Sequence, residues 1–250
     1  MYGGILEMYD NRVKKTVNMN EKALVGILML ETSHDRIPGD IGNPSTFRFP
    51  VERKLVKGAL PNRVVVEADP GLVPLFAKAA KELEEQGIKA IATSCGLMSI
   101  FQKELSNAVN IPLFTSSLIQ VPMVDKMLGR EKIVGIITVN SKSLTKRHLE
   151  AVGITDEMEV AIIGMNEGHY FLKVFLEESL ELDRDKIEKE VIEIGKKLVK
   201  QNPRVGAVVF ECSNLPPYAK ALQEAIRLPI FDVITLINMV HETLERKNYC

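Results

Sequence analysis

This 250-residue chain contains no tryptophan, only four histidines and only three cysteines. Three is an odd number, and no two of the cysteines form a CxxC pair, which argues against a disulfide framework and against a structural zinc site. The histidines show no HxxxH or HxH spacing, so we predict no metal site. Cysteines outside any such framework are typical of a reducing compartment, and we therefore expect a cytoplasmic protein.

The chain also lacks an excess of either charge, with 32 Lys and Arg against 33 Asp and Glu. It has no basic block, so no nucleic-acid partner is predicted. Residues 1–22 lack the apolar segment of a secretory signal, and no run is long enough to span a membrane, so we expect no membrane partner either. No glycine-rich phosphate loop follows a strand, which argues against a bound nucleotide cofactor.

What the chain does contain is a series of short apolar segments that alternate with segments of helical period. This alternation is typical of βαβ units, in which parallel strands are buried between helices. We therefore predict an α/β fold with eight parallel strands. They are expected at residues 24–30, 64–67, 90–94, 111–115, 132–139, 159–165, 205–211 and 228–232.

An internal repeat divides these strands into two sets. When the chain is shifted by 117 positions, residues 90–114 align with residues 207–231, and seven of the 25 aligned positions are identical. Cys95 aligns with Cys212 without a gap, and a proline, Pro112 or Pro229, follows each cysteine 17 positions later. A weaker similarity relates residues 25–28 to residues 134–137. Shared strand–helix composition alone could produce part of this match, but the aligned cysteines favour a duplicated unit.

The repeat predicts two lobes related by a pseudo-twofold axis, each with a four-stranded parallel sheet flanked by helices and with the active site in the cleft between them. We assign residues 23–117 and a C-terminal helix at residues 234–248 to the first lobe, and residues 118–233 to the second. Residues 1–22 form an N-terminal arm. Cys250, the last residue, is expected to be an exposed bystander.

Cys95 and Cys212 each end an apolar strand and precede a helix, which is where parallel α/β sheets bind ligands. A buried hydrophobic role would explain either cysteine alone, whereas the repeat-matched pair indicates function. Free N–H groups at the following helix would favour the thiolate. Two such sulfurs about 7 Å apart could remove a proton from one face of a carbon and return one to the other face.

Around these cysteines the sequence resembles the aspartate/glutamate racemase superfamily, over most of residues 23–245. The similar segments are residues 92–96, Ala-Thr-Ser-Cys-Gly, and residues 211–218, Glu-Cys-Ser-Asn-Leu-Pro-Pro-Tyr. The resemblance implies a two-lobed α/β fold and an isomerase without metal or cofactor, in which Cys95 and Cys212 are the paired acid/base residues. It implies a racemase or epimerase acting on a small amino acid, hydantoin or related acid, and the residues after each cysteine leave the substrate open.

Other residues are candidates for holding the substrate, because they stand at the ends of predicted strands or in the Gly- and Pro-rich segment 32–50. That segment is either a substrate loop or a solvated connection with surface arginines, Arg36 and Arg48 among them. Its hydroxyl, amide and guanidinium groups suit a carboxylate or amide ligand, although such residues are also common in turns. The candidates are Asn43, Arg48, Ser94, Gly96, Thr115, Ser116, Asn140, Ser141, Ser213 and Asn214.

Two other functions stay open at the level of sequence. A maleate-type cis–trans isomerase would use one cysteine as a nucleophile and the other as an acid. A two-lobed binding protein would hold a small anion between its lobes without reaction. The missing export signal and the matched cysteines argue against the binding protein, and a homodimer is possible in each case.

Overall fold

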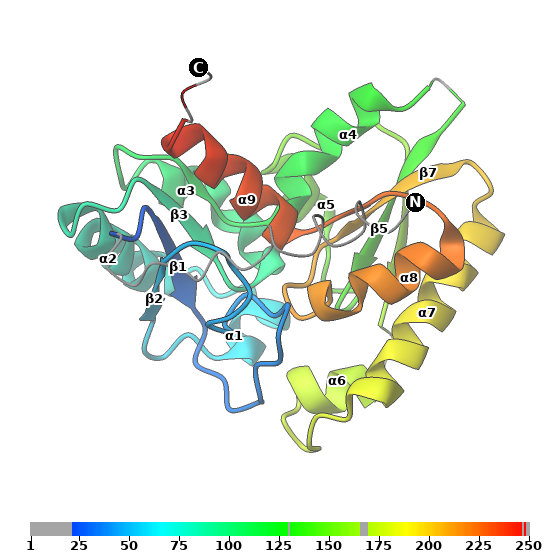
Figure 1. The fold of residues 1–250 in the computed structure, drawn as a ribbon, viewed down its shortest axis with the longest axis horizontal. Coiled ribbons are helices and arrows are strands. Elements are labelled where there is room, and N and C mark those ends of the chain that lie inside the picture. The colour runs from blue at the N-terminus through cyan, green and yellow to red at the C-terminus, as the bar shows by residue number, and fades with distance from the viewer. Residues whose placement is uncertain (1–21, 130, 166–169, 247, 249–250) are drawn as a thin grey trace, which may run out of the picture.

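The computed structural model describes residues 22–129, 131–165, 170–246 and 248, and it confirms the predicted fold class (Figure 1). Each half of the chain forms a four-stranded parallel sheet with the order second, first, third, fourth. The predicted arm lies outside the described residues except for its last residue, and so does Cys250. The strands are β1 (Val25–Met29), β2 (Val51–Leu55), β3 (Ala90–Thr93) and β4 (Leu113–Phe114) in the first sheet, and β5 (Ile133–Thr138), β6 (Val160–Gly164), β7 (Val205–Phe210) and β8 (Ile230–Phe231) in the second.

One predicted strand is wrong. Residues 64–67 form no strand, because Pro61–Val65 is a short helix, α1, with Pro61 in its first turn and with Val64 and Val65 buried. The strand beside β1 is β2, whose sequence Val-Glu-Arg-Lys-Leu carries charged residues. An edge strand is partly solvated and tolerates this composition, so a search for continuous apolar runs does not find it. The other predicted strands overlap observed ones.

The repeat is visible in how the first strand of each half meets its covering helix. A Cβ added at Gly26 of β1 would lie 2.8 Å from Leu83 of α2 (Leu72–Glu85). A Cβ at Gly135 of β5 would lie 2.8 Å from Leu198 of α7 (Arg184–Gln201). A leucine of the long helix therefore packs directly on the backbone of the first strand in both halves, and glycine is required there because a side chain would occupy its space.

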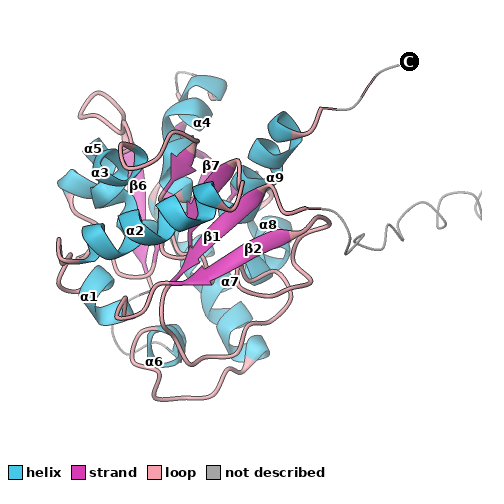
Figure 2. Ribbon diagram, turned by 90° about the vertical axis from the view of Figure 1, so that its left-hand side faces the viewer, coloured by secondary structure: helices cyan, strands magenta, loops and turns pink. Residues whose placement is uncertain are grey.

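The remaining helices lie around the two sheets (Figures 1 and 2). In the first half they are the 3-10 helix η2 (Gly96–Phe101), α3 (Gln102–Ser106), η3 (Ser117–Gln120) and α4 (Val121–Met127). In the second half they are α5 (Lys146–Glu150), α6 (Tyr170–Phe175), η4 (Pro216–Tyr218), α8 (Ala219–Ile226) and the C-terminal helix α9 (Val233–Leu244).

Alternate residues of β1 face different layers, as the two-residue period of a strand requires. Leu28 belongs to a large core cluster that includes Leu83 of α2 and extends into the second half. Val25 and Ile27 belong to a smaller cluster with Leu236 and Ile237 of α9. The C-terminal helix thus packs on the sheet of the first half. The large cluster joins both halves, so apolar packing holds the cleft-forming edges together.

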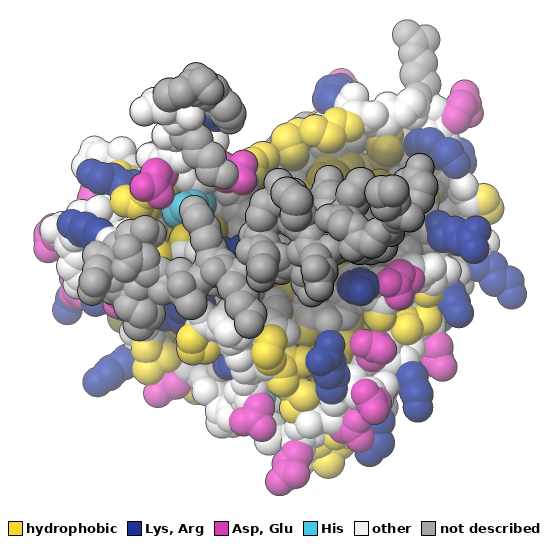
Figure 3. All heavy atoms as spheres, in the orientation of Figure 1, with side chains coloured by type: hydrophobic (Ala, Val, Ile, Leu, Met, Phe, Trp, Pro, Cys, Tyr) yellow, Lys and Arg dark blue, Asp and Glu magenta, His cyan; other side chains and the backbone are white. Residues whose placement is uncertain are grey.

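The described surface carries charges of both signs, which are interspersed over the face shown in Figure 3. In the part of the chain that the structure describes, no helix combines the length and the apolar character needed to cross a membrane.

Candidate active site

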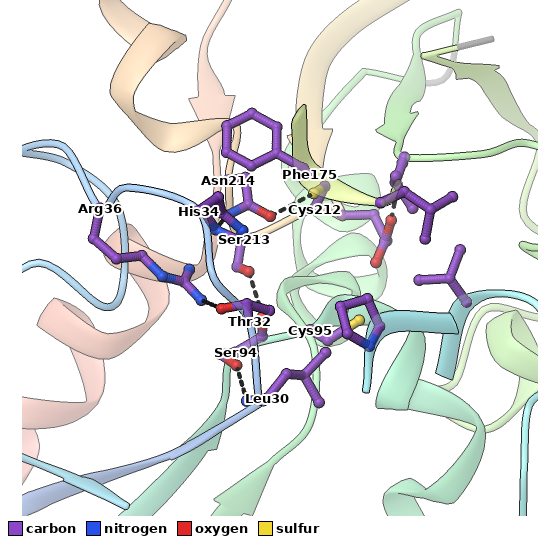
Figure 4. A pocket seen from close by; sticks show the side chains of 16 residues that line it. Leu30, Thr32, His34, Arg36, Ser94, Cys95, Phe175, Cys212, Ser213 and Asn214 are labelled. Atoms are coloured by element: carbon purple, nitrogen blue, oxygen red, sulfur yellow. Dashed lines mark hydrogen bonds between the residues drawn. The ribbon is translucent and has the colours of Figure 1, made fainter. Parts of the chain in front are cut away.

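Cys95 and Cys212 line one pocket between the two halves, and Figure 4 shows them entering it from the two lobes. Cys95 follows β3 and precedes η2, and Cys212 follows β7 and precedes η4. The pocket has a volume of about 450 Å³, part of which is open solvent. Both cysteines carry free thiols. The structure thus brings the two repeat-matched residues to the carboxyl ends of neighbouring parallel strands, where such folds bind ligands.

The segments that carry the cysteines touch each other. The hydroxyl of Ser213 donates a 2.5 Å hydrogen bond to the carbonyl oxygen of Ser94, and the hydroxyl of Ser117 donates one of 2.5 Å to the carbonyl oxygen of Phe210. Gly96 lies so close to Glu211 that an added Cβ would be 2.1 Å from the Glu211 carbonyl oxygen. These contacts fix the position of each sulfur relative to the opposite lobe.

The ionisation of the thiols differs from the sequence-based expectation. Burial raises the pKa of Cys95 to about 12, with the nearby Glu211 carboxyl as the second cause, and the backbone N–H groups of Leu97 and Met98 oppose the shift. Burial and Glu211 also raise the pKa of Cys212, against the N–H of Asn214. The N–H donors are therefore present as predicted, but desolvation outweighs them, and the thiols are protonated in the empty pocket.

Glu211 also lines the pocket and is almost completely buried. Its Oε2 accepts a hydrogen bond of 2.7 Å from the Thr138 hydroxyl and one of 3.3 Å from the Val139 N–H. Its Oε1 is buried and has no hydrogen-bond partner among the described residues. Burial raises the pKa of this carboxyl to about 7, although both hydrogen bonds lower it.

A chain of polar side chains connects Cys212 with the segment after β1. The Cys212 thiol lies 3.6 Å from Oδ1 of Asn214, whose Nδ2 donates a 2.9 Å hydrogen bond to Asp40. Asp40 accepts a 3.0 Å bond from Arg36, which donates another of 2.7 Å to the Thr32 hydroxyl. Arg36 and Thr32 line the pocket (Figure 4). This network places a cation at the pocket wall and orients the amide beside Cys212.

His34 completes this side of the pocket. Its Nε2 lies 3.2 Å from Asn214 Nδ2, and its Nδ1 lies 3.5 Å from Oε1 of Glu178. Burial, followed by the charge of Arg36, lowers its pKa to about 4, so the ring is neutral near pH 7. Since Asn214 Nδ2 donates, Nε2 of the neutral ring accepts, and Nδ1 carries the proton on the side of Glu178.

The predicted substrate-binding residues separate into two groups. Ser94, Gly96, Ser213 and Asn214 line the pocket. The others make contacts elsewhere: Thr115 bonds to Gln102, Ser116 accepts the N–H of Leu118, Asn140 accepts the N–H of Lys142, Ser141 packs on Gly164, Asn43 bonds to the Arg36 carbonyl oxygen, and Arg48 is exposed. The geometry therefore gives no pocket contact to the second group.

A comparison with known families assigns this fold and site. The chain matches the model of the Asp/Glu/Hydantoin racemase family over residues 67–238, which is more than half of its length and includes both pocket cysteines. The chain belongs to this family. The predicted resemblance is confirmed at this level.

Within the racemase family, curated relatives carry another activity in their names. Dimethylsulfoniopropionate lyase 5 of Emiliania huxleyi is 26% identical over 231 residues, which cover 87% of this chain and 44% of that protein. The dimethylsulfoniopropionate lyase of Durusdinium sp. clade D is 28% identical over 219 residues, covering 85% of this chain and 72% of that one. The chain thus spans less than half of the first of these relatives.

Solved structures of the racemase family share the fold at low identity. Allantoin racemase from Klebsiella pneumoniae has a TM-score of 0.59 with 13% identity, covering 89% of this chain and 88% of that one. Glutamate racemase RacE1 from Bacillus anthracis has a TM-score of 0.56 with 12% identity, covering 89% and 81%. At these identities the similarity establishes the fold only.

Sequence reasoning missed Glu211, His34, Thr32 and Asp40 as members of the site. Glu211 had a usable signal, because it is the one charged residue at the end of the apolar run 205–210 and directly precedes Cys212. The repeat aligns it with Ser94, so the two halves differ next to their cysteines. The other three lie in the irregular segment after β1, where spacing does not reveal which side chains turn inward.

Proposed function

We propose that this chain removes the proton from a carbon next to a substrate carbonyl group, with Cys95 and Cys212 as the acid/base pair, and returns a proton on the opposite face. It would thus be a racemase or epimerase of a small amino acid, hydantoin or related acid. One observation carries the proposal: two repeat-related thiols from opposite lobes line a single pocket. The proposed steps use only side chains and N–H groups of this chain.

In the first step a thiolate takes the proton from the substrate carbon, and the electron pair of the C–H bond moves toward the carbonyl oxygen. The second thiol gives its proton to the other face, and the pair then returns as thiolate and thiol in exchanged positions. A thiolate formed in this pocket is a strong base, because the desolvation that raises the thiol pKa raises its proton affinity. The N–H groups of Leu97 and Met98 at Cys95 support its charge.

The names of the curated relatives favour a second candidate, a lyase acting on dimethylsulfoniopropionate or a similar β-substituted acid. It would begin with the same proton abstraction beside the carboxylate. The electron pair would then form a carbon–carbon double bond while the bond to the β-sulfur breaks, which releases dimethyl sulfide and acrylate. The two candidates differ only in whether the β-substituent leaves.

The test incubates the protein in heavy water with pools of amino acids, hydantoins and hydroxy acids, and separately with dimethylsulfoniopropionate. Mass spectrometry follows deuterium at the α-carbon, chiral chromatography follows inversion, and gas chromatography follows dimethyl sulfide. Deuterium incorporation with inversion supports the racemase, and dimethyl sulfide release supports the lyase. Cys95→Ala and Cys212→Ala should each abolish the activity.

The remaining alternatives have distinct outcomes in the same experiment. A maleate-type isomerase would isomerise maleate and form a covalent adduct at one sulfur only, which intact-protein mass spectrometry detects. A binding protein would show no exchange in any pool and would keep its ligand affinity in a Cys95→Ala, Cys212→Ala double variant. Either outcome would overturn the acid/base proposal.

A further inference from the structure

The carboxyl group of Glu211 is the buried group that the steps above leave unused. It stands at the carboxyl end of β7, next to Cys212, and its charge raises the pKa of both pocket thiols. A carboxylate beside two prospective thiolates would oppose the chemistry through like-charge repulsion. Its presence in the pocket therefore calls for a role in which it is neutral.

The hydrogen bonds of Glu211 determine which oxygen carries its proton. Oε2 accepts from the Thr138 hydroxyl and from the Val139 N–H, and a backbone N–H can only donate. Oε2 therefore acts as an acceptor, and the proton of the neutral acid belongs on Oε1. Oε1 is buried without a partner among the described residues, so the neutral acid has an O–H donor that needs an acceptor.

The surroundings favour the neutral acid. No described salt bridge involves Glu211, and burial raises its pKa to about 7. The titratable and charged side chains that line the pocket with it are Cys95, Cys212, His34 and Arg36, of which Arg36 is bound to Asp40. A substrate carboxylate entering this pocket would raise the Glu211 pKa further, because two adjacent carboxylates do not both ionise.

We propose that Glu211, as a neutral carboxylic acid, donates a hydrogen bond from Oε1 to a carboxylate or carbonyl oxygen of the substrate, and that this contact selects substrates with an acceptor there. The inference rests on the proposed function. As the α-proton leaves, negative charge grows on that oxygen and the hydrogen bond strengthens, with no transfer of the Glu211 proton. Donors placed where charge develops lower the barrier most effectively.

The structure also suggests why a glycine faces this acid. A Cβ at position 96 would lie 2.3 Å from Oε1 of Glu211. Any side chain there would displace the carboxyl oxygen that carries the proton. Gly96 is therefore a positioning residue for Glu211 as well as a close neighbour of Cys95.

Binding of propionate by the wild-type protein tests the inference without any variant. Binding to the protonated acid predicts a constant Kd below pH 7 and a Kd that rises about tenfold per pH unit above it, because binding must take up one proton. His34, with a pKa of about 4, does not titrate between pH 5.5 and 8.5. A Kd that is independent of pH over this range would overturn the inference.

Glu211→Gln and Glu211→Ala provide the matched kinetic comparison. Glutamine keeps an N–H donor, so kcat/KM should stay within about tenfold of wild type and propionate binding should lose its pH dependence. Alanine removes the donor and should reduce kcat by about 100-fold or more. Equal losses in both variants would instead indicate that a charged Glu211 attracts a cationic substrate group. Activity that persists in Cys95→Ala would refute the proposed function itself, which the Glu211 comparison does not test.

Discussion

The hydroxyl of Ser213 donates a 2.5 Å hydrogen bond to the carbonyl oxygen of Ser94, so the residue after one pocket cysteine is tied to the residue before the other. Both partners are buried, and the bond crosses between the two halves of the chain. The Cys95 and Cys212 segments are thus held directly against each other. Proton transfer requires such fixed placement, since a displacement of about 1 Å can cost about 100-fold in rate.

Removal of either sulfur should stop proton exchange. We expect Cys95→Ala and Cys212→Ala each to lower the rate of α-deuterium incorporation by at least about 100-fold, because each removes one acid/base partner. Mass spectrometry of the recovered substrate measures this rate. Cys250→Ala is the matched control, since Cys250 lies outside the region that matches the family, and it should leave the rate unchanged. Equal rates in all three variants would contradict the assignment.

Gly96→Ala should destabilise the protein, because the new Cβ would meet the Glu211 carbonyl oxygen at 2.1 Å. Overpacking of this kind costs about 1–3 kcal/mol or more of unfolding free energy, measurable by urea denaturation. Gly129→Ala is the control, since an added Cβ there meets nothing within 4 Å. The close approach would be disproved by equal stability of the two variants.

Neutral buried histidines should make the fold sensitive to mild acid. The pKa of His148 is lowered to about 4 by burial and by Arg147, against 6.5 in the unfolded chain. Its stabilisation is therefore present above pH 6.5 and is lost as the pH falls toward 4, by about 1–3 kcal/mol. His148→Gln should reduce this decline in urea titrations between pH 7.5 and 4. An unchanged pH slope would show that His148 does not contribute.

Glu211 should shift stability in the opposite direction. Its folded pKa of about 7 is above the reference value of 4.5, so its stabilisation is greatest below pH 4.5 and is lost as the pH rises through 7. Glu211→Gln should therefore gain up to about 3 kcal/mol relative to wild type at pH 8, with little gain at pH 4.5. Urea denaturation at the two pH values measures this difference. A gain that is the same at both would refute the raised pKa.

Glu178 connects the second half to the segment after β1. Its carboxylate accepts hydrogen bonds of 2.7 Å and 2.9 Å from the N–H and the hydroxyl of Ser33. We expect Glu178→Ala to speed amide hydrogen exchange in residues 32–36, because two hydrogen bonds to a charged group are lost. Exchange measured by mass spectrometry tests this expectation.

Two further variants separate the possible causes of such a change. Glu178→Gly removes the same carboxylate but relieves the positive φ of 49° at this position, so it should lose less global stability than Glu178→Ala. Glu181→Ala is the control, since Glu181 contributes only its carbonyl oxygen, to the Tyr170 hydroxyl. Faster exchange in the control as well would attribute the effect to the loop rather than to Glu178.

The edge strand β2 shows where local pattern stops being informative. Its Glu52, Arg53 and Lys54 do not look like a buried strand, yet pairing with β1 makes them one. The apolar Val64 and Val65 look like a strand and belong to α1, where both are buried on one side of a short helix. Partner availability, which depends on the whole fold, outweighs residue propensity in both segments.

The sequence by itself determined the two-lobed α/β fold and the pairing of Cys95 with Cys212, because strand alternation and an ungapped repeat are local properties of the chain. Only the tertiary structure decided that both thiols are buried and protonated, that Glu211 stands between them with one oxygen unpaired, and that Asn214, Asp40 and Arg36 form a single network. These features depend on desolvation and on contacts between residues as far as 174 positions apart. Spacing along the chain carries no record of either.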